Sequence, residues 1–207
     1  MNRTASIRIK GINVTELKEN LPYISLLVLA ITAILLGALS VNNALFSNFS
    51  SEIFKDFIDN RKSIDFFDKY ISVAWNSLKY PIISFLCATS VLGIVLSPLC
   101  LIYVSFCYGI IAGNFYVNFG ISGIVFNLFV LIIPSIVLIF TLIVSVKNSI
   151  AFSLKIARVC TKDVRCSNLY QSFRLFCLKQ LVLALPIMLS VLIDVTFFDL
   201  FKNYINI

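Results

Sequence analysis

The uncharged run from Tyr80 to Val146 is the feature that most restricts the fold. It extends over 67 residues and contains no Asp, Glu, Lys or Arg. A helix of about 20 apolar residues crosses a hydrocarbon core of about 30 Å, so the run is long enough for several crossings. Because 59% of the 207 residues are hydrophobic and 13% are charged, we expect one polytopic membrane domain over 1–207.

Backbone-breaking residues divide this run into three expected spans. Pro98 lacks an N–H and disfavours helical conformation in the residue before it, so a turn is expected at Ser97-Pro98. Phe119-Gly120-Ile121-Ser122-Gly123 is the second expected break. The spans between these breaks are predicted at 81–96, 98–117 and 123–146.

One further span is expected on each side of the run. Residues 23–41 form an apolar segment that opens at Pro22, after a basic leader, and residues 177–195 form the last span. Ala38-Leu39-Ser40 has the small-x-small pattern of a signal-peptide cleavage site, but the long leader and the length of the apolar segment favour an uncleaved anchor. The sequence therefore predicts an all-α membrane protein with five transmembrane helices.

The distribution of basic residues predicts the orientation. The leader and the segment 147–176, together with Lys179, hold 11 of the 17 Lys and Arg residues, whereas the segment 42–79 has no net charge. Basic segments stay in the cytoplasm, and an even number of spans is needed to place both on that side. We therefore expect a cytoplasmic N-terminus and an extracytoplasmic C-terminus. Since these bases flank membrane spans, no nucleic acid partner is expected.

The extracytoplasmic segment 42–79 has the pattern of two amphipathic helices. Ile53, Phe54, Phe57 and Ile58 share one face, with Ser51 as the expected N-cap, and a second apolar face follows the i, i+3, i+4 spacing. Such faces rest either on lipid or on other spans, or they bind an extracytoplasmic partner. The candidate partner-binding residues are Phe54, Phe57, Phe67, Tyr70 and Trp75.

Enzymatic chemistry is not expected of this chain. It has no histidine, which removes the commonest base, proton relay and zinc ligand, and we expect neither a cofactor nor a metal. Four of the six cysteines lie in apolar spans, and the segment 42–79 has none, so no disulfide framework is expected there. Cys160 and Cys166 are a single cytoplasmic pair and only a weak metal signal.

A few polar or special residues within the spans leave alternatives open. Asp194 lies at a span end, and Asn114 and Asn127 lie in or near spans three and four. Pro134 is either a tolerated kink or part of a discontinuous transporter helix. Gly109-x-x-x-Gly113 is a close-packing motif, for which we favour an intrachain contact with span two, four or five over homodimerisation.

The ordered set of these features resembles stage II sporulation protein M of endospore-forming bacteria over nearly the whole chain. After the leader, the first span and the amphipathic segment come short motifs in a fixed order: Ser77-Leu78-Lys79-Tyr80, the break from Gly93 to Pro98, Gly109-Ile110-Ile111-Ala112-Gly113, Phe119-Gly120, Leu131-Ile132-Ile133-Pro134-Ser135, Ser149-Ile150-Ala151-Phe152-Ser153-Leu154 and Ile193-Asp194. Broader relatives of that family carry Pro-His-Gly and a Glu before the proline, where this chain has Asn127, Leu128 and Ile132.

The resemblance implies a non-enzymatic scaffold in the bacterial cytoplasmic membrane, at the septum, during forespore engulfment. In that family the M protein works with the stage II sporulation proteins D and P, which remodel peptidoglycan outside the membrane. Peptidoglycan hydrolases of the D and P type and the lipid bilayer are therefore the expected partners, and no small-molecule substrate is expected. The alternative is a small permease or permease subunit, for which Asn114, Asn127 and Pro134 would be the residues to examine.

Overall fold

The computed structural model describes residues 8–9, 12–61, 65–161 and 169–201, with side chains from Asn20 onward. The expected all-α fold is confirmed, apart from one antiparallel pair of two-residue strands, β1 (Arg8–Ile9) and β2 (Ile12–Asn13). The helices, in chain order, are α1 (Val14–Ser40), η1 (Ala44–Phe46), α2 (Ser47–Asp59), α3 (Phe66–Ala88), α4 (Gly93–Phe126), the π-helix η2 (Asn127–Ile132), α5 (Ile133–Thr161) and α6 (Leu169–Phe201).

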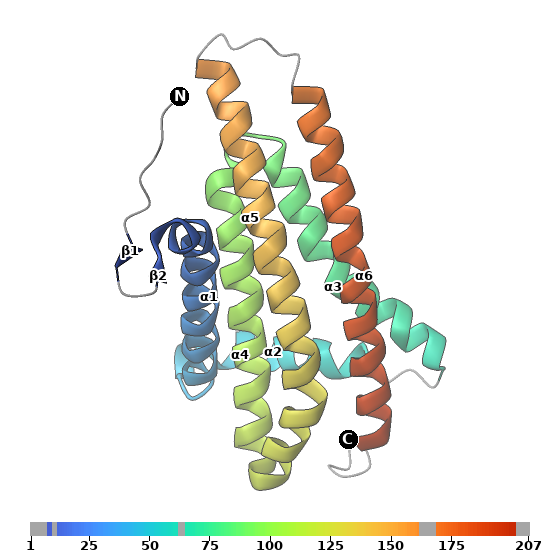
Figure 1. Cartoon of the computed structure of the whole chain (residues 1–207). Coiled ribbons are helices and arrows are strands. Elements are labelled where there is room, and N and C mark those ends of the chain that lie inside the picture. Colours follow the sequence, from blue (N-terminus) through green and yellow to red (C-terminus); the bar gives the residue numbers. More distant parts are fainter. Residues whose placement is uncertain (1–7, 10–11, 62–64, 162–168, 202–207) are drawn as a thin grey trace.

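The long helices α1, α3, α4, α5 and α6 pack side by side, and α2 lies across them (Figure 1). At one end of the bundle, α4 reverses at Gly120 and α6 finishes at Phe201; we call this the Gly120 end. At the opposite end, α5 finishes at Thr161 and α6 begins; we call this the Thr161 end. The helix α2 lies in the half of the bundle nearer the Gly120 end.

Three helical segments among the described residues are long and apolar enough to cross a membrane. They are Asn20–Ser40, Gly93–Cys160 and Leu169–Phe201. The second is 68 residues long and contains the reversal at Gly120, so it folds back along itself. The helix α3 is not among the three, because Asn76 and Lys79 lower its mean hydropathy.

The expected turn at Ser97-Pro98 is wrong. The chain turns at Thr89–Leu92, and Pro98 lies inside α4. A Cβ on Gly93 would collide with the backbone of Cys87 and Ala88, so only glycine permits this close return. The Ser153 hydroxyl of α5 donates hydrogen bonds to the carbonyl oxygens of Ser90 (2.5 Å) and Val91 (3.2 Å), which holds the turn from a distant part of the chain.

The second break does lie where the sequence places it. Gly120 has φ 56° and ψ −129°, which is unfavourable for residues with a Cβ, and a Cβ on Gly123 would collide with the Phe115 carbonyl. The chain then passes through the π-helix before Pro134. Pro134 has no N–H to continue the helical ladder, and the Ser190 hydroxyl of α6 donates to its carbonyl oxygen at 2.7 Å.

The glycine motif of α4 packs against α1. A Cβ on Gly109 would collide with the Ile34 carbonyl, and one on Gly113 would lie 2.8 Å from the Val41 side chain and 3.0 Å from the Ala38 carbonyl oxygen. Across the same interface, Gly37 faces the backbone of Phe106. The contact lies within the chain, but its partner is span one, which is none of the three spans that we expected.

The first apolar span begins close to the expected Pro22: it is Asn20–Ser40, although its helix α1 already begins at Val14. One expected helix start differs. The expected N-cap Ser51 lies inside α2, where its hydroxyl donates to the Asn48 carbonyl oxygen at 2.8 Å. The start lies earlier because the Asn43 side chain accepts a hydrogen bond from the Leu45 N–H and begins η1, which runs directly into α2.

Candidate functional site

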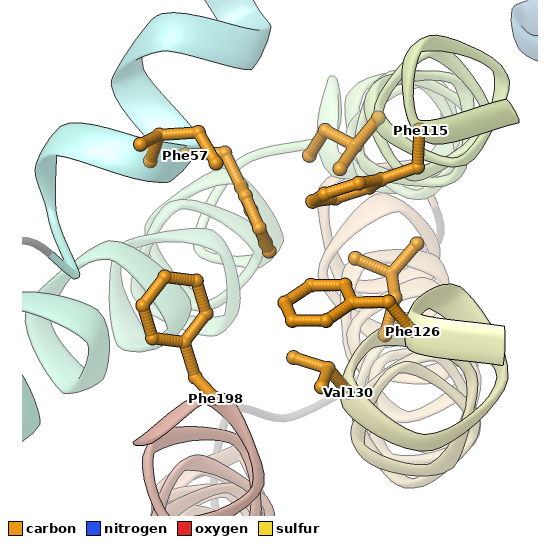
Figure 2. Close-up of a cluster of buried hydrophobic side chains, with 8 residues drawn as sticks. Phe57, Phe115, Phe126, Val130 and Phe198 are labelled. Carbon is orange, nitrogen blue, oxygen red and sulfur yellow. The ribbon is translucent and has the colours of Figure 1, made fainter. Parts of the chain in front are cut away.

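Phenylalanine side chains anchor α2 to the bundle at the Gly120 end. Phe57 of α2, Phe115 and Phe126 of α4 and Phe198 of α6 point toward one another (Figure 2). Phe115 is the centre: its ring centroid lies 5.9 Å from that of Phe57 and 5.0 Å from those of Phe54 and Phe126. Phe54 and Phe57 were candidate partner-binding residues, but their rings pack on another span, which is the alternative that their amphipathic pattern left open.

A buried ion pair fixes the chain just after α2. The guanidinium of Arg61 donates from Nη2 to Asp194 Oδ2 at 2.5 Å and from Nε to Oδ1 at 3.3 Å. The Arg61 Nη1 also donates to the Phe57 carbonyl oxygen at 2.8 Å, and its Cζ lies 3.6 Å from the centroid of the Phe57 ring. Because the side chains are only 6% and 10% exposed, water solvates neither charge well, and each is neutralised by the other.

A second ion pair holds the start of α3 against the end of α6. The Lys69 ammonium lies 2.5 Å from Asp199 Oδ1, and the Lys69 side chain is 4% exposed. One residue further on, Tyr70 packs against α6, with its hydroxyl 3.3 Å from the Met188 sulfur. Tyr70, another expected partner-binding residue, therefore faces the bundle.

The remaining two expected partner-binding residues point outward. Phe67 is 77% exposed and Trp75 is 68% exposed, and Ile71 lies between them at 61%. Their i, i+4, i+8 spacing puts all three on one face of α3. We call Phe67, Ile71 and Trp75 the α3 stripe. The structure thus divides the five expected residues: Phe67 and Trp75 are available at the surface, and Phe54, Phe57 and Tyr70 are in packed positions.

A polar cavity of about 180 Å³ lies between α2, α3 and α4. Its wall includes Arg61, Lys79, and three tyrosines, Tyr80, Tyr103 and Tyr108. The Lys79 ammonium donates to Asn76 Oδ1 at 3.0 Å and lies 5.1 Å from the centroid of the Tyr80 ring. Lys79 is nine residues from the end of α3, about 14 Å along the helix, and its side chain is half-buried.

Serine and glutamine side chains join the long helices away from this cavity. Ser84 of α3 and Ser149 of α5 share a hydrogen bond of 3.1 Å. Gln180 of α6 accepts from the Ser145 hydroxyl at 2.9 Å and donates to the Ser149 hydroxyl at 3.4 Å. Small residues with such hydrogen bonds let apolar helices approach closely, so we assign this group to packing.

The two asparagines of the transport alternative have different surroundings. Asn114 Nδ2 donates to the Ser50 hydroxyl at 2.7 Å and to the Ile110 carbonyl oxygen at 2.9 Å, so it ties α2 to α4. Asn127, the first residue of the π-helix, has a buried Oδ1 that accepts no hydrogen bond from any described residue. Neither side chain lines the polar cavity.

The described residues contain no group of three or more His, Cys, Asp or Glu side chains that could hold a metal ion. Cys160 is exposed at the end of α5, and its expected companion Cys166 lies outside the described residues, as do the expected bases Arg3, Lys10, Lys162 and Arg165.

No family model, curated protein or solved structure matches this chain. The resemblance to stage II sporulation protein M therefore depends on the order of its sequence motifs.

Sequence reasoning missed the buried charges at the Gly120 end. Arg61 and Lys69 lie in a polar segment of zero net charge, where nothing local distinguishes a buried base from an exposed one. Their partners, Asp194 and Asp199, lie more than 120 residues further along the chain. Asp194 and Asp199 are the only acids in α5 and α6, and this was the one sequence signal that they could pair with buried bases.

Proposed function

We propose that this protein is a multi-pass membrane protein with five spans, a cytoplasmic N-terminus and an extracytoplasmic C-terminus. The charge distribution supports this orientation. Among described residues from Asn20 onward, all seven acids belong to α2, the start of α3, the segment between them or the last turns of α6, toward the Gly120 end. Four bases, Lys155, Arg158, Arg174 and Lys179, lie toward the Thr161 end, against three, Lys55, Arg61 and Lys69, toward the Gly120 end. The Thr161 end then faces the cytoplasm.

Its role, in this proposal, is that of a non-enzymatic scaffold, and the α3 stripe is the observation that carries it. Three large apolar side chains project from a helix whose opposite face is fixed by the Lys69–Asp199 pair and the Tyr70 contact. A rigid aromatic surface loses little side-chain freedom when a partner binds, which favours recognition. On the extracytoplasmic side such a surface can hold a second protein close to the membrane.

The partners that we propose are peptidoglycan-remodelling enzymes of the stage II sporulation D and P type. This part rests on the resemblance of the sequence to stage II sporulation protein M. The protein would then keep these hydrolases at the septal membrane during forespore engulfment, and the hydrolases would carry out the peptidoglycan remodelling.

Capture of purified D- and P-type hydrolases by the full-length protein in nanodiscs tests the role. Phe67→Ser with Trp75→Ser should lower capture about 30-fold or more, because an aromatic residue at an interface centre contributes about 2 kcal/mol or more. The matched control is Tyr170→Ser, since Tyr170 is also 77% exposed but lies near the start of α6, at the Thr161 end. Equal capture by wild type and the Phe67/Trp75 variant would contradict the scaffold role of the stripe.

The second candidate function is a small permease, and the polar cavity favours it. An ionisable residue among the helices of a membrane bundle often marks a transport path, and the half-buried Lys79 lies in the wall of this cavity. This role requires substrate-dependent flux in reconstituted vesicles that is lost in Lys79→Met and retained in Lys55→Met, whose lysine is exposed on α2.

A further inference from the structure

A groove of about 120 Å³ lies between α5 and α6 near the Thr161 end. Its polar wall consists of Asn148 and Lys155 from α5 and Ser172 and Lys179 from α6, and the rings of Phe152 and Phe176 form its apolar part. These rings are stacked, with centroids 4.8 Å apart, which holds the two helices in register. The Lys155 ammonium donates to the Ser172 hydroxyl at 3.4 Å, so the lysine is already directed across the groove.

The two lysines have no acid near them on either helix. The helix α5 contains no Asp or Glu. The two acids of α6, Asp194 and Asp199, come 15 and 20 residues after Lys179, which is about 22 to 30 Å along the helix. The groove therefore has two exposed cations, and both acids of α6 bind cations at the opposite end.

Lys155 lies at the height where lipid headgroups would be. It is 22 residues, about 33 Å of helix, from the start of α5 at Ile133, which is close to the hydrocarbon thickness of about 30 Å. Because Lys155 contacts Ser172, Lys179 begins seven residues along α6, about 10 Å, nearer the Gly120 end. With the Gly120 end at one interface, Lys155 lies at the other, and the long Lys179 side chain can extend toward it.

Exposed apolar side chains continue from the groove toward the Gly120 end. On α5, Phe140 (60%) lies 11 residues, about three turns, before Ala151 and so on nearly the same face, and Ile136 (62%) lies one turn further. On α6, Val182 (63%) lies one turn beyond Lys179, and Leu189 (64%) two turns further. A ligand that occupied this surface would need an anionic head and long apolar chains.

We propose that the groove binds the headgroup of an anionic phospholipid, with the phosphate between the ammonium groups of Lys155 and Lys179 and an acyl chain over the apolar surface below. A free phosphate could use the lysines but not the apolar surface, which is why we infer a lipid. This inference rests on the proposed membrane placement and is independent of the scaffold role.

The test is lipid retention by the full-length purified protein, measured by native mass spectrometry. Phosphatidylglycerol and phosphatidylcholine with identical acyl chains are compared. Wild type should retain phosphatidylglycerol preferentially, and each of Lys155→Gln and Lys179→Gln should lower that preference about fivefold, as for a lysine near an anionic headgroup. Lys155→Arg with Lys179→Arg should keep the preference, because the charge remains.

Lys55→Gln removes the same charge from the exposed face of α2 and should have no effect. Three outcomes would overturn the proposal: an unchanged preference in the Lys155/Lys179 double variant, an equal loss in Lys55→Gln, or displacement of the lipid by millimolar inorganic phosphate. Hydrolase capture by the Lys155/Lys179 double variant distinguishes the lipid site from the scaffold role. If the variant loses the lipid preference but captures hydrolases normally, the scaffold role is unaffected. Recovery of the protein in the soluble fraction of cells would contradict the proposed membrane placement, on which the lipid site depends.

Discussion

Arg61 and Asp194 are 133 residues apart in the sequence, and their side chains form a two-point ion pair. The pair joins the end of the α2 region to α6, inside the half of the bundle nearer the Gly120 end. Its Nη2–Oδ2 distance is 2.5 Å, and the Arg61 guanidinium also stacks on Phe57. The position of α2 is therefore set jointly by this pair and by the phenylalanine cluster around Phe115.

Removing one member of this pair should destabilise the protein strongly. Asp194→Ala leaves the buried Arg61 charge without its partner, which typically costs about 3 to 5 kcal/mol. Arg61→Met combined with Asp194→Leu should recover most of that loss, because neither buried charge remains. Thermal unfolding of the purified protein in detergent measures the loss in Asp194→Ala and its recovery in the double variant. The fluorescence of Trp75, the only tryptophan, follows the unfolding.

The control for this cycle is Lys55→Met, which removes an exposed charge from α2 and should change stability by less than about 0.5 kcal/mol. Asp194→Ala with an unchanged unfolding temperature would mean that the Arg61–Asp194 pair does not hold the fold.

The α1–α4 interface predicts an order among glycine substitutions. Gly109→Ala places a methyl group against the backbone carbonyl of Ile34, which can yield only if the helices separate, so we expect a loss of about 1 to 3 kcal/mol. Gly113→Ala meets first a methyl of Val41, which can rotate away, and should cost less. Denaturant titration in mixed micelles gives both values, with Val117→Ala on the exposed face of α4 as the control.

The same variants address homodimerisation. If Gly109→Ala left the unfolding free energy unchanged but separated a dimer in cross-linking, the glycine motif would act between chains instead of between α1 and α4.

Local sequence features predicted the parts of the fold that have local causes. The uncharged run indicated apolar helices, and glycine at residue 120 indicated the reversal, because positive φ there excludes most other residues. The turn at Thr89–Leu92 was missed since it is held by Ser153 of α5, which no local pattern reveals. Pro98 misled because a proline near the start of a long packed helix can be tolerated.

The helical spacing of apolar residues also did not predict which residues of α3 lie at the surface. Tyr70 and Ile71 are adjacent and both apolar in character, but Tyr70 packs against Met188 and Ile71 is 61% exposed. The helical spacing showed that α3 has an apolar face without showing where α6 would cover it. The contacts of Arg61 and Lys69 depend in the same way on acids far along the chain.

Accessibility of Cys160 tests the orientation. Cys160 is exposed at the end of α5, and the proposed topology places it in the cytoplasm. In a variant whose other five cysteines are replaced by alanine or serine, a membrane-impermeant maleimide should label Cys160 only after the cells are permeabilised. Phe67→Cys in a fully cysteine-free background should be labelled in intact cells, because Phe67 is 77% exposed and the proposed topology places it on the opposite side of the membrane. Labelling of Cys160 in intact cells would reverse the proposed topology.

Asn127 offers a way to separate the scaffold from the permease. Its Oδ1 is buried in the π-helix and accepts no hydrogen bond from the described residues, so the amide contributes little that a leucine would not. A buried polar group without a partner costs about 1 to 3 kcal/mol, and Asn127→Leu should therefore leave stability unchanged or raise it.

If the protein is a scaffold, hydrolase capture by Asn127→Leu should equal that of wild type. If a transported solute or water supplies the missing hydrogen bond, flux through reconstituted vesicles should fall while stability holds. Asn114→Leu is the contrasting variant: it breaks the hydrogen bond to Ser50, so it should destabilise the contact between α2 and α4 under either role.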